Sequence, residues 1–289
     1  FAMLTIIQWY KEFSGNSKPV IWLPDYFCNE PLEFLKKLDI TFNFYPITDS
    51  LNPNWDQCKT LAKTKKPDIF FLVHYFGKCN DIKNAKTFCD DINCIFVEDA
   101  AHVIQPYAEI GKFSDFIFFS QHKLFAIPDG SLLILNTKSK RIKKISEKRS
   151  IDIINKVIEG YPKISPSSLK WLFKRCFQKI LPDYLWINKD KVDLTKSAKI
   201  AFEPFQSFLS KRLLNIEKNY ISDYVNLRKQ NDASLRVGFN RDKQIEDDFT
   251  PYMSMIQFNN SQQARKYYSY KRSPLMIWPD LPEKVLKKS

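Results

Sequence analysis

The chain has 289 residues, of which 44% are hydrophobic and 27% charged, so it can build one large domain or two smaller ones and is not a disordered chain. Its longest apolar stretch, Ile69 to Phe76, is interrupted by His74 and is too short to cross a bilayer. The six cysteines form no C-x-x-C pair or regular framework, which predicts reduced thiols and no metal site. We therefore expect a globular cytoplasmic protein with no membrane partner.

The net charge of +13 is concentrated in the later part of the sequence. Residues 1–100 hold 11 basic and 13 acidic side chains, whereas residues 101–289 hold 34 and 19. A basic face suits nucleic acid, an anionic membrane or a phosphorylated substrate, and a solvated lysine-rich surface explains the same charge. Because the sequence has no RNP, zinc-finger or helix-turn-helix motif, we expect no nucleic-acid partner.

Short β-branched and aromatic runs alternate with amphipathic stretches in the first half of the chain. The runs that predict strands are Val20–Leu23, Thr41–Ile47, Ile69–His74, Cys94–Glu98, Phe116–Ser120 and Leu132–Leu135. Helical spacing marks Pro53–Lys65 and Asp81–Asp91, with Asp81 as the expected N-cap. This order predicts an α/β fold with a mostly parallel sheet flanked by helices, which binds ligands at the carboxyl ends of its strands.

From about Lys138 the alternation stops and helical patterns dominate. Helices are expected around Ser207–Lys229 and Ser261–Tyr270, and a dense basic run extends from Lys138 to Arg149. We place a domain boundary in that run. The sequence thus predicts a large α/β domain at residues 1–145 and a smaller helix-rich part at residues 146–289.

Residue types suited to catalysis lie at the predicted strand ends. All three histidines, His74, His102 and His122, fall at or just after such an end. The segment CIFVEDAAH, Cys94–His102, places Asp99 at the end of a strand, which equally fits a helix N-cap. The two following alanines leave space for a flat ring, with which Asp99 would form an ion pair through a protonated ring nitrogen.

A lysine follows the next strand. In FIFFSQHKLFAIPDGSLLIL, Phe116–Leu135, Lys123 lies among aromatic residues before a Pro-Asp-Gly turn. Partial desolvation there would favour a neutral, nucleophilic amine. The same position fits an ordinary loop lysine.

Taken in order, these segments resemble the DegT/StrS family of PLP-dependent sugar aminotransferases. The similar segments are IWLPDYF at Ile21–Phe27, LNPNW at Leu51–Trp55, VHYFG at Val73–Gly77, VEDAAH at Val97–His102 and WPDLP at Trp278–Pro282. Family members have a Gly-Gly pair seven and eight residues after the catalytic lysine. Gly130 and Ser131 occupy those positions here, which aligns Lys123 with that lysine. The resemblance implies the fold type I architecture and is closest over residues 1–136.

The resemblance also implies roles for individual residues. Lys123 would bind pyridoxal 5′-phosphate (PLP) covalently and move the proton during catalysis, and Asp99 would keep the pyridine nitrogen protonated. His102 would lie near the 3-hydroxyl of the ring. The remaining cofactor-binding candidates are those for stacking on the ring, Phe27 or Tyr26, and those for contacting the phosphate, Ser120 or Gln121.

By this resemblance the chain is an aminotransferase that acts on a nucleotide-linked keto-sugar, as in polysaccharide biosynthesis, with an amino acid such as glutamate as donor, and it forms a homodimer. The turn with which family members grip the phosphate would precede Phe1, so we expect that the N-terminus is truncated. The alternative is a non-catalytic fold type I relative that serves as an interaction or regulatory protein, which the change to Ser131 would fit.

Overall fold

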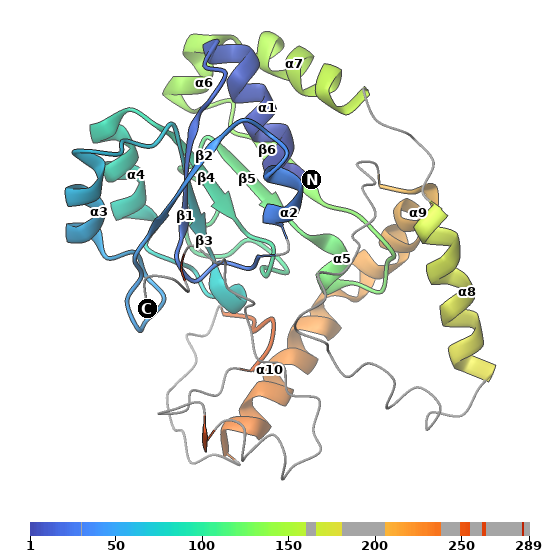
Figure 1. The fold of residues 1–289 in the computed structure, drawn as a ribbon. Helices are drawn as coiled ribbons and strands as arrows, with labels where there is room; N and C mark the ends of the chain where they lie inside the picture. Colours follow the sequence, from blue (N-terminus) through green and yellow to red (C-terminus); the bar gives the residue numbers. More distant parts are fainter. Residues whose placement is uncertain are drawn as a thin grey trace.

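The fold was analysed in a computed structural model that describes residues 1–29, 31–159, 166–180, 206–237, 249–254, 262–263 and 285. Its centre is a six-stranded sheet with the order β2-β1-β3-β4-β5-β6 (Figure 1). The strands are β1 (Val20–Pro24), β2 (Thr41–Tyr45), β3 (Ile69–Val73), β4 (Ile95–Asp99), β5 (Phe116–Phe119) and β6 (Leu132–Leu135). The first five are parallel and β6 pairs antiparallel with β5. All six predicted strands and the mostly parallel sheet are therefore confirmed.

One face of the sheet is covered by α1 (Ala2–Ser14), α6 (Lys140–Ile145) and α7 (Glu147–Glu159). Because side chains alternate along a strand, Ile69, Phe71 and Val73 of β3 all reach this layer. There they pack in the same cluster as the buried side chains of α1 and α6. Trp9 of α1 lies with its ring edge-on to Phe116 of β5, and the ring centroids are 4.7 Å apart.

The opposite face is covered by α3 (Trp55–Ala62) and α4 (Ile82–Ile92). Phe70 of β3 is fully buried there among Trp22, Trp55 and Phe88. The predicted N-cap is confirmed, because the Asp81 side chain accepts a hydrogen bond from the backbone of Asn84. The strands thus lie between two helical layers, as buried parallel strands require.

The remaining elements are short helices near the sheet and the C-terminal helices. They are α2 (Leu32–Leu35), η1 (Tyr75–Gly77), α5 (Gln121–Leu124), α8 (Pro166–Ile180), α9 (Phe208–Glu217), η3 (Lys218–Tyr220) and α10 (Ile221–Val237). The helix expected around 207–229 is confirmed as α9, η3 and α10. Most of the helix expected at 261–270, and the WPDLP segment, lie outside the described residues.

The first helix after residue 145 still packs against the sheet and its helices. Helix α7 packs on α1, and Ile153 and Ile154 contact the core between α1 and the sheet. The domain boundary at residue 145 remains a prediction. None of the helices in the described ranges is long and apolar enough to cross a membrane.

Candidate functional site

The site lies at the carboxyl ends of β3, β4 and β5, where parallel strands present their following residues along one edge of the sheet. His74 follows β3, Asp99 ends β4, and Ser120 follows β5. Their backbones are joined across the strands, since His74 N–H donates to the Asp99 carbonyl (3.0 Å) and Ala100 N–H donates to the Phe118 carbonyl (2.9 Å).

The Asp99 side chain is 8% exposed. Burial raises the pKa of this carboxyl group, while the positive charge of Lys123 and the Ala101 N–H act in the opposite direction. Within the described part of the chain, that N–H is the one hydrogen-bond donor to the carboxylate, at 3.0 Å from Oδ1. Asp99 is therefore a buried acid that still has acceptor capacity for a cationic partner.

The three residues predicted to be central, Asp99, His102 and Lys123, lie together. Lys123 Nζ is 3.5 Å from His102 Nε2. The Phe76 N–H donates to His102 Nδ1 over 3.3 Å, and burial lowers the pKa of His102 to about 3, with a further contribution from the Lys123 charge. Because Nδ1 accepts a hydrogen bond, the neutral His102 ring carries its proton on Nε2 and presents an N–H donor to the site.

Two aromatic side chains enclose the His102 ring, and sequence reasoning identified neither of them. The Tyr252 ring is stacked on it at a centroid distance of 4.4 Å and an interplanar angle of 4°, and Phe76 lies at 6.0 Å and 21°. Phe76 has a φ of 56°, a left-handed conformation that is uncommon for a bulky residue. Its carbonyl accepts the Tyr252 N–H at 2.7 Å.

Gly77 explains why the segment carrying Tyr252 can come so close. Its φ is +93°, and a Cβ atom built on it would be 2.6 Å from the Thr250 carbonyl oxygen and 3.0 Å from that of His102. Only glycine avoids this overlap. The VHYFG segment at Val73–Gly77 thus connects the end of β3 to residues 250–252 through backbone contacts.

Lys123 lies on the one-turn helix α5, and its side chain is exposed. The expected partial desolvation of this lysine is therefore wrong, because Lys123 is exposed in the structure. The two candidates for contacting the phosphate, Ser120 and Gln121, have different surroundings. Ser120 is buried, with its hydroxyl 3.3 Å from His122 Nδ1, whereas Gln121 contacts Gln206 at 3.4 Å.

The turn after Lys123 is held by residues that are distant in sequence. The Asp129 carboxylate accepts hydrogen bonds from the Ser168 hydroxyl (2.5 Å) and the Ser207 N–H (2.7 Å). Gly130 has a φ of +127°, and a Cβ atom there would be 2.7 Å from the Gln206 amide nitrogen. The Pro-Asp-Gly turn is thus fixed against the start of α8 and α9.

The aromatic candidates after β1 have different environments. Phe27 is buried in the core on the α1 side of the sheet. Tyr26 is half-buried beside Tyr75, with ring centroids 5.8 Å apart, and the Tyr75 hydroxyl donates to the Tyr26 carbonyl at 2.6 Å. Their stacking on a cofactor ring remains a prediction.

Behind the site, His74 is hydrogen-bonded to Glu98. Its Nε2 is 2.8 Å from Glu98 Oε2, and both side chains are fully buried. The Asn80 N–H donates to Nδ1, and the Gly111 N–H donates to the Glu98 carboxylate. The three histidines therefore do not share one role, because His74 supports the sheet edge and His102 contacts Lys123.

Part of the chain is similar in sequence to a known family. Residues 47–150 match the sequence profile described as the DegT/DnrJ/EryC1/StrS aminotransferase family. No curated protein sequence matches the chain.

The fold resembles several solved structures. One is a DegT/DnrJ/EryC1/StrS aminotransferase from Brucella abortus, with a TM-score of 0.56 and 13% identity over 86% of this chain and 61% of that chain. Another is Helicobacter pylori PseC, an aminotransferase involved in the biosynthesis of pseudoaminic acid, with a TM-score of 0.57 and 15% identity over 94% of this chain and 65% of that chain. The present chain thus spans less than two thirds of the length of either structure.

The resemblance predicted from the sequence is thereby confirmed over residues 47–150, and the predicted fold is confirmed. The described architecture is the fold type I arrangement of these solved aminotransferases. Asp99, His102 and Lys123 all lie in the segment, residues 47–150, that is similar to the DegT/DnrJ/EryC1/StrS aminotransferase family.

Proposed function

We propose that the protein is a PLP-dependent aminotransferase. The observation that supports this most is the convergence of Asp99, His102 and Lys123 at the carboxyl edge of the sheet, with Lys123 Nζ 3.5 Å from His102. These residue types come from two different strand ends, and a structural N-cap or a loop lysine would not require them to meet.

The residues present fit the chemistry of the cofactor. Asp99 is a buried carboxylate whose pKa is raised by burial, and such a group is stabilised by a cation such as a protonated pyridine nitrogen. Lys123 offers an accessible amine, and the His102 ring offers an Nε2–H donor suited to the ring hydroxyl. Bound PLP would supply an electron sink for the carbanion that forms when the α-proton is removed. The phosphate-binding turn expected before Phe1 stays a prediction.

Three residues of the chain would have roles in the reaction. Lys123 would hold the cofactor through its side-chain amine and would carry the proton that is taken from one carbon and returned to another. Asp99 holds a positive charge at the far end of the site, where burial strengthens the ion pair. His102 keeps its neutral form because it is buried, so it donates a hydrogen bond and does not compete for the proton.

We further propose a keto-sugar carried by a nucleotide as the amino acceptor, and glutamate as the donor. The support is the family resemblance, the involvement of the similar PseC structure in pseudoaminic acid biosynthesis, and the excess of basic residues after residue 100. A diphosphate group would be attracted by that charge. A homodimer is proposed on the same resemblance.

The test is covalent capture of the cofactor. The protein is mixed with PLP, its visible absorbance is recorded, the mixture is reduced with borohydride, and the modified peptide is identified by mass spectrometry. We expect modification of Lys123 in the wild type and none at this site in Lys123→Ala. Lys112→Ala, which removes an exposed lysine from the same domain, is the matched control and should behave as the wild type.

Two results would overturn the proposal. One is the absence of any absorbance band in the wild type, and the other is equal modification of wild type and Lys123→Ala. Either result would favour the alternative of a non-catalytic relative that retained the fold.

A further inference from the structure

We propose that Arg228 is a positioning residue that holds Lys123 and His102 in their relative geometry by binding two backbone carbonyl groups. This inference builds on the proposed function, because it assigns a support to the same site. It concerns the chain's own residues, so its test does not depend on turnover.

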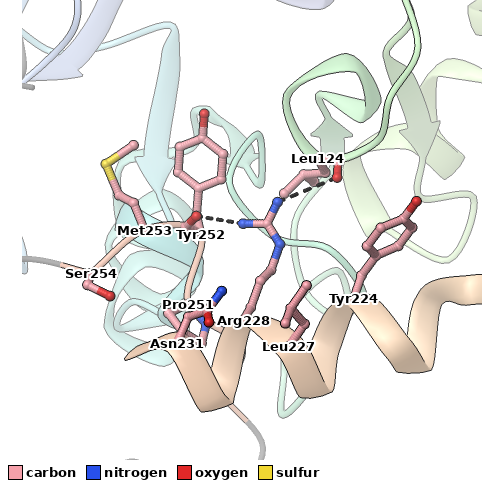
Figure 2. Close-up of a pocket in the computed structure, with 9 residues that line it drawn as sticks. All are labelled: Leu124, Tyr224, Leu227, Arg228, Asn231, Pro251, Tyr252, Met253 and Ser254. Atoms are coloured by element: carbon pink, nitrogen blue, oxygen red, sulfur yellow. Dashed lines mark hydrogen bonds between the residues drawn. The ribbon is translucent and has the colours of Figure 1, made fainter. Parts of the chain in front are cut away.

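Arg228 lies on α10, far from Lys123 in sequence, and its side chain is half-buried. Figure 2 shows its guanidinium between the end of α5 and the segment 251–254, in a pocket of about 400 Å³. One terminal nitrogen donates to the Tyr252 carbonyl at 2.6 Å, and the other donates to the Leu124 carbonyl at 3.5 Å. The guanidinium carbon is also 5.8 Å from the centroid of the Tyr252 ring.

Each of these carbonyls belongs to a segment that carries part of the site. Leu124 is the residue after Lys123, and Tyr252 is the residue whose ring is stacked on His102. Because His102 contacts Lys123, five residues form a closed circuit, which runs from Arg228 through Leu124 and Lys123 to His102 and Tyr252. A shift of α10 would therefore move both partners of the Lys123–His102 contact.

The elements that are held need such a support. Helix α5 has four residues, and a single turn has little stability of its own, because nucleation of a helix is unfavourable. The segment 249–254 has no regular secondary structure, and its backbone hydrogen bond to the sheet edge is that of Tyr252 with Phe76. Burial of the apolar residues Leu124 and Pro251 also stabilises these segments, but the hydrophobic effect does not fix their orientation.

Arginine suits this position better than lysine. Its planar guanidinium presents several N–H donors in a fixed fork, so it can bind two carbonyls in one orientation. A lysine keeps the charge but presents one compact ammonium group on a flexible stem. We therefore expect Arg228→Lys to retain part of the effect and Arg228→Met to lose it.

The experiment measures amide hydrogen exchange in the cofactor-free protein, with Arg212→Met on α9 as the matched control, since it removes one exposed positive charge. Loss of hydrogen bonds to a charged donor should speed exchange of the Tyr252 and Phe76 amides and of the α5 amides about tenfold or more in Arg228→Met. Exchange in β3 and β4 should not change. A second readout is PLP affinity, which should fall in Arg228→Met and not in Arg212→Met.

The outcomes separate this inference from the proposed function. If Arg228→Met exchanges like the wild type at Tyr252 and α5, the positioning role is refuted even when PLP binds normally. If exchange rises as expected but PLP never binds, the circuit stands and the proposed function fails. Should Arg228→Met not fold, Arg228→Lys provides the same comparison, and unchanged exchange in a folded Arg228→Lys together with unchanged PLP affinity would refute the proposal.

Discussion

Substitution of Gly77 by alanine tests whether the contact between the sheet edge and the segment 250–252 is real. The new Cβ would be 2.6 Å from the Thr250 carbonyl oxygen and 3.0 Å from that of His102, so the backbone must move. The same residue would also have to adopt a φ of +93°, which costs an L-residue about 1–2 kcal/mol. Overpacking against backbone adds about 1–3 kcal/mol.

Gly15→Ala is the matched control, because it shares the backbone cost without the collision. Gly15 has a φ of +71° at the C-terminal end of α1, and nothing lies within 4 Å of a Cβ built there. We therefore expect Gly77→Ala to lower the free energy of unfolding by about 1–3 kcal/mol more than Gly15→Ala does.

The assay is urea denaturation of the two variants and the wild type, followed by hydrogen exchange at Tyr252. Gly77→Ala should release the hydrogen bond from the Tyr252 N–H to the Phe76 carbonyl and speed exchange of that amide, whereas Gly15→Ala should leave it protected. Equal stability losses in the two variants, with no local change at Tyr252, would refute the close approach.

Three further predictions concern ionisable residues of the site. The pKa of His102 is lowered to about 3, so the unfolded state takes up the proton first as pH falls below about 6.5. The wild type should therefore lose about 2 kcal/mol of stability between pH 6.5 and pH 5, as measured by urea denaturation at each pH. His102→Gln should lose less stability over the same range. The pKa of Asp99 is raised by burial, so its native carboxylate opposes folding above the unfolded pKa. Asp99→Asn should therefore raise the melting temperature of the cofactor-free protein at pH 7, and this gain should vanish in acid. The same substitution should lower PLP affinity about tenfold or more. Glu98→Ala would leave the buried Nε2–H of His74 without its acceptor and should lower the free energy of unfolding by about 1–3 kcal/mol in urea denaturation, and an unchanged free energy would contradict this buried hydrogen bond.

Local patterns in the sequence were sufficient to predict the sheet. Each strand is a short β-branched and aromatic run, and β3 is apolar throughout because both of its faces are covered. The position of Asp99 and Lys123 follows from the same reasoning, since residues after parallel strands must meet at one edge. Their meeting with His102 depended on the resemblance as well, because strand-end histidines are also common structural residues.

The parts that were not predicted depend on contacts between distant segments. Tyr252 has no local feature that would indicate stacking on His102, since its position results from the backbone space at Gly77. Arg228 is one of three basic residues in α10, and its two carbonyl partners lie on other segments. The exposure of Lys123 likewise depends on where α5 leaves the sheet, which hydrophobic periodicity does not determine.

The residues that contact the site from the C-terminal part of the chain are far from the sheet in sequence, and this affects the order of folding. Strand β1 pairs with β2, and β3 pairs with β4, each through a single crossover, so these contacts close smaller loops at a lower entropic cost. The hydrogen bonds of Asp129 to Ser207 and of Arg228 to Leu124 close much longer loops. A chain emerging from the ribosome would therefore assemble Asp99 and the sheet edge first, and Lys123 would reach its final position only after α10 and Tyr252 had been synthesised.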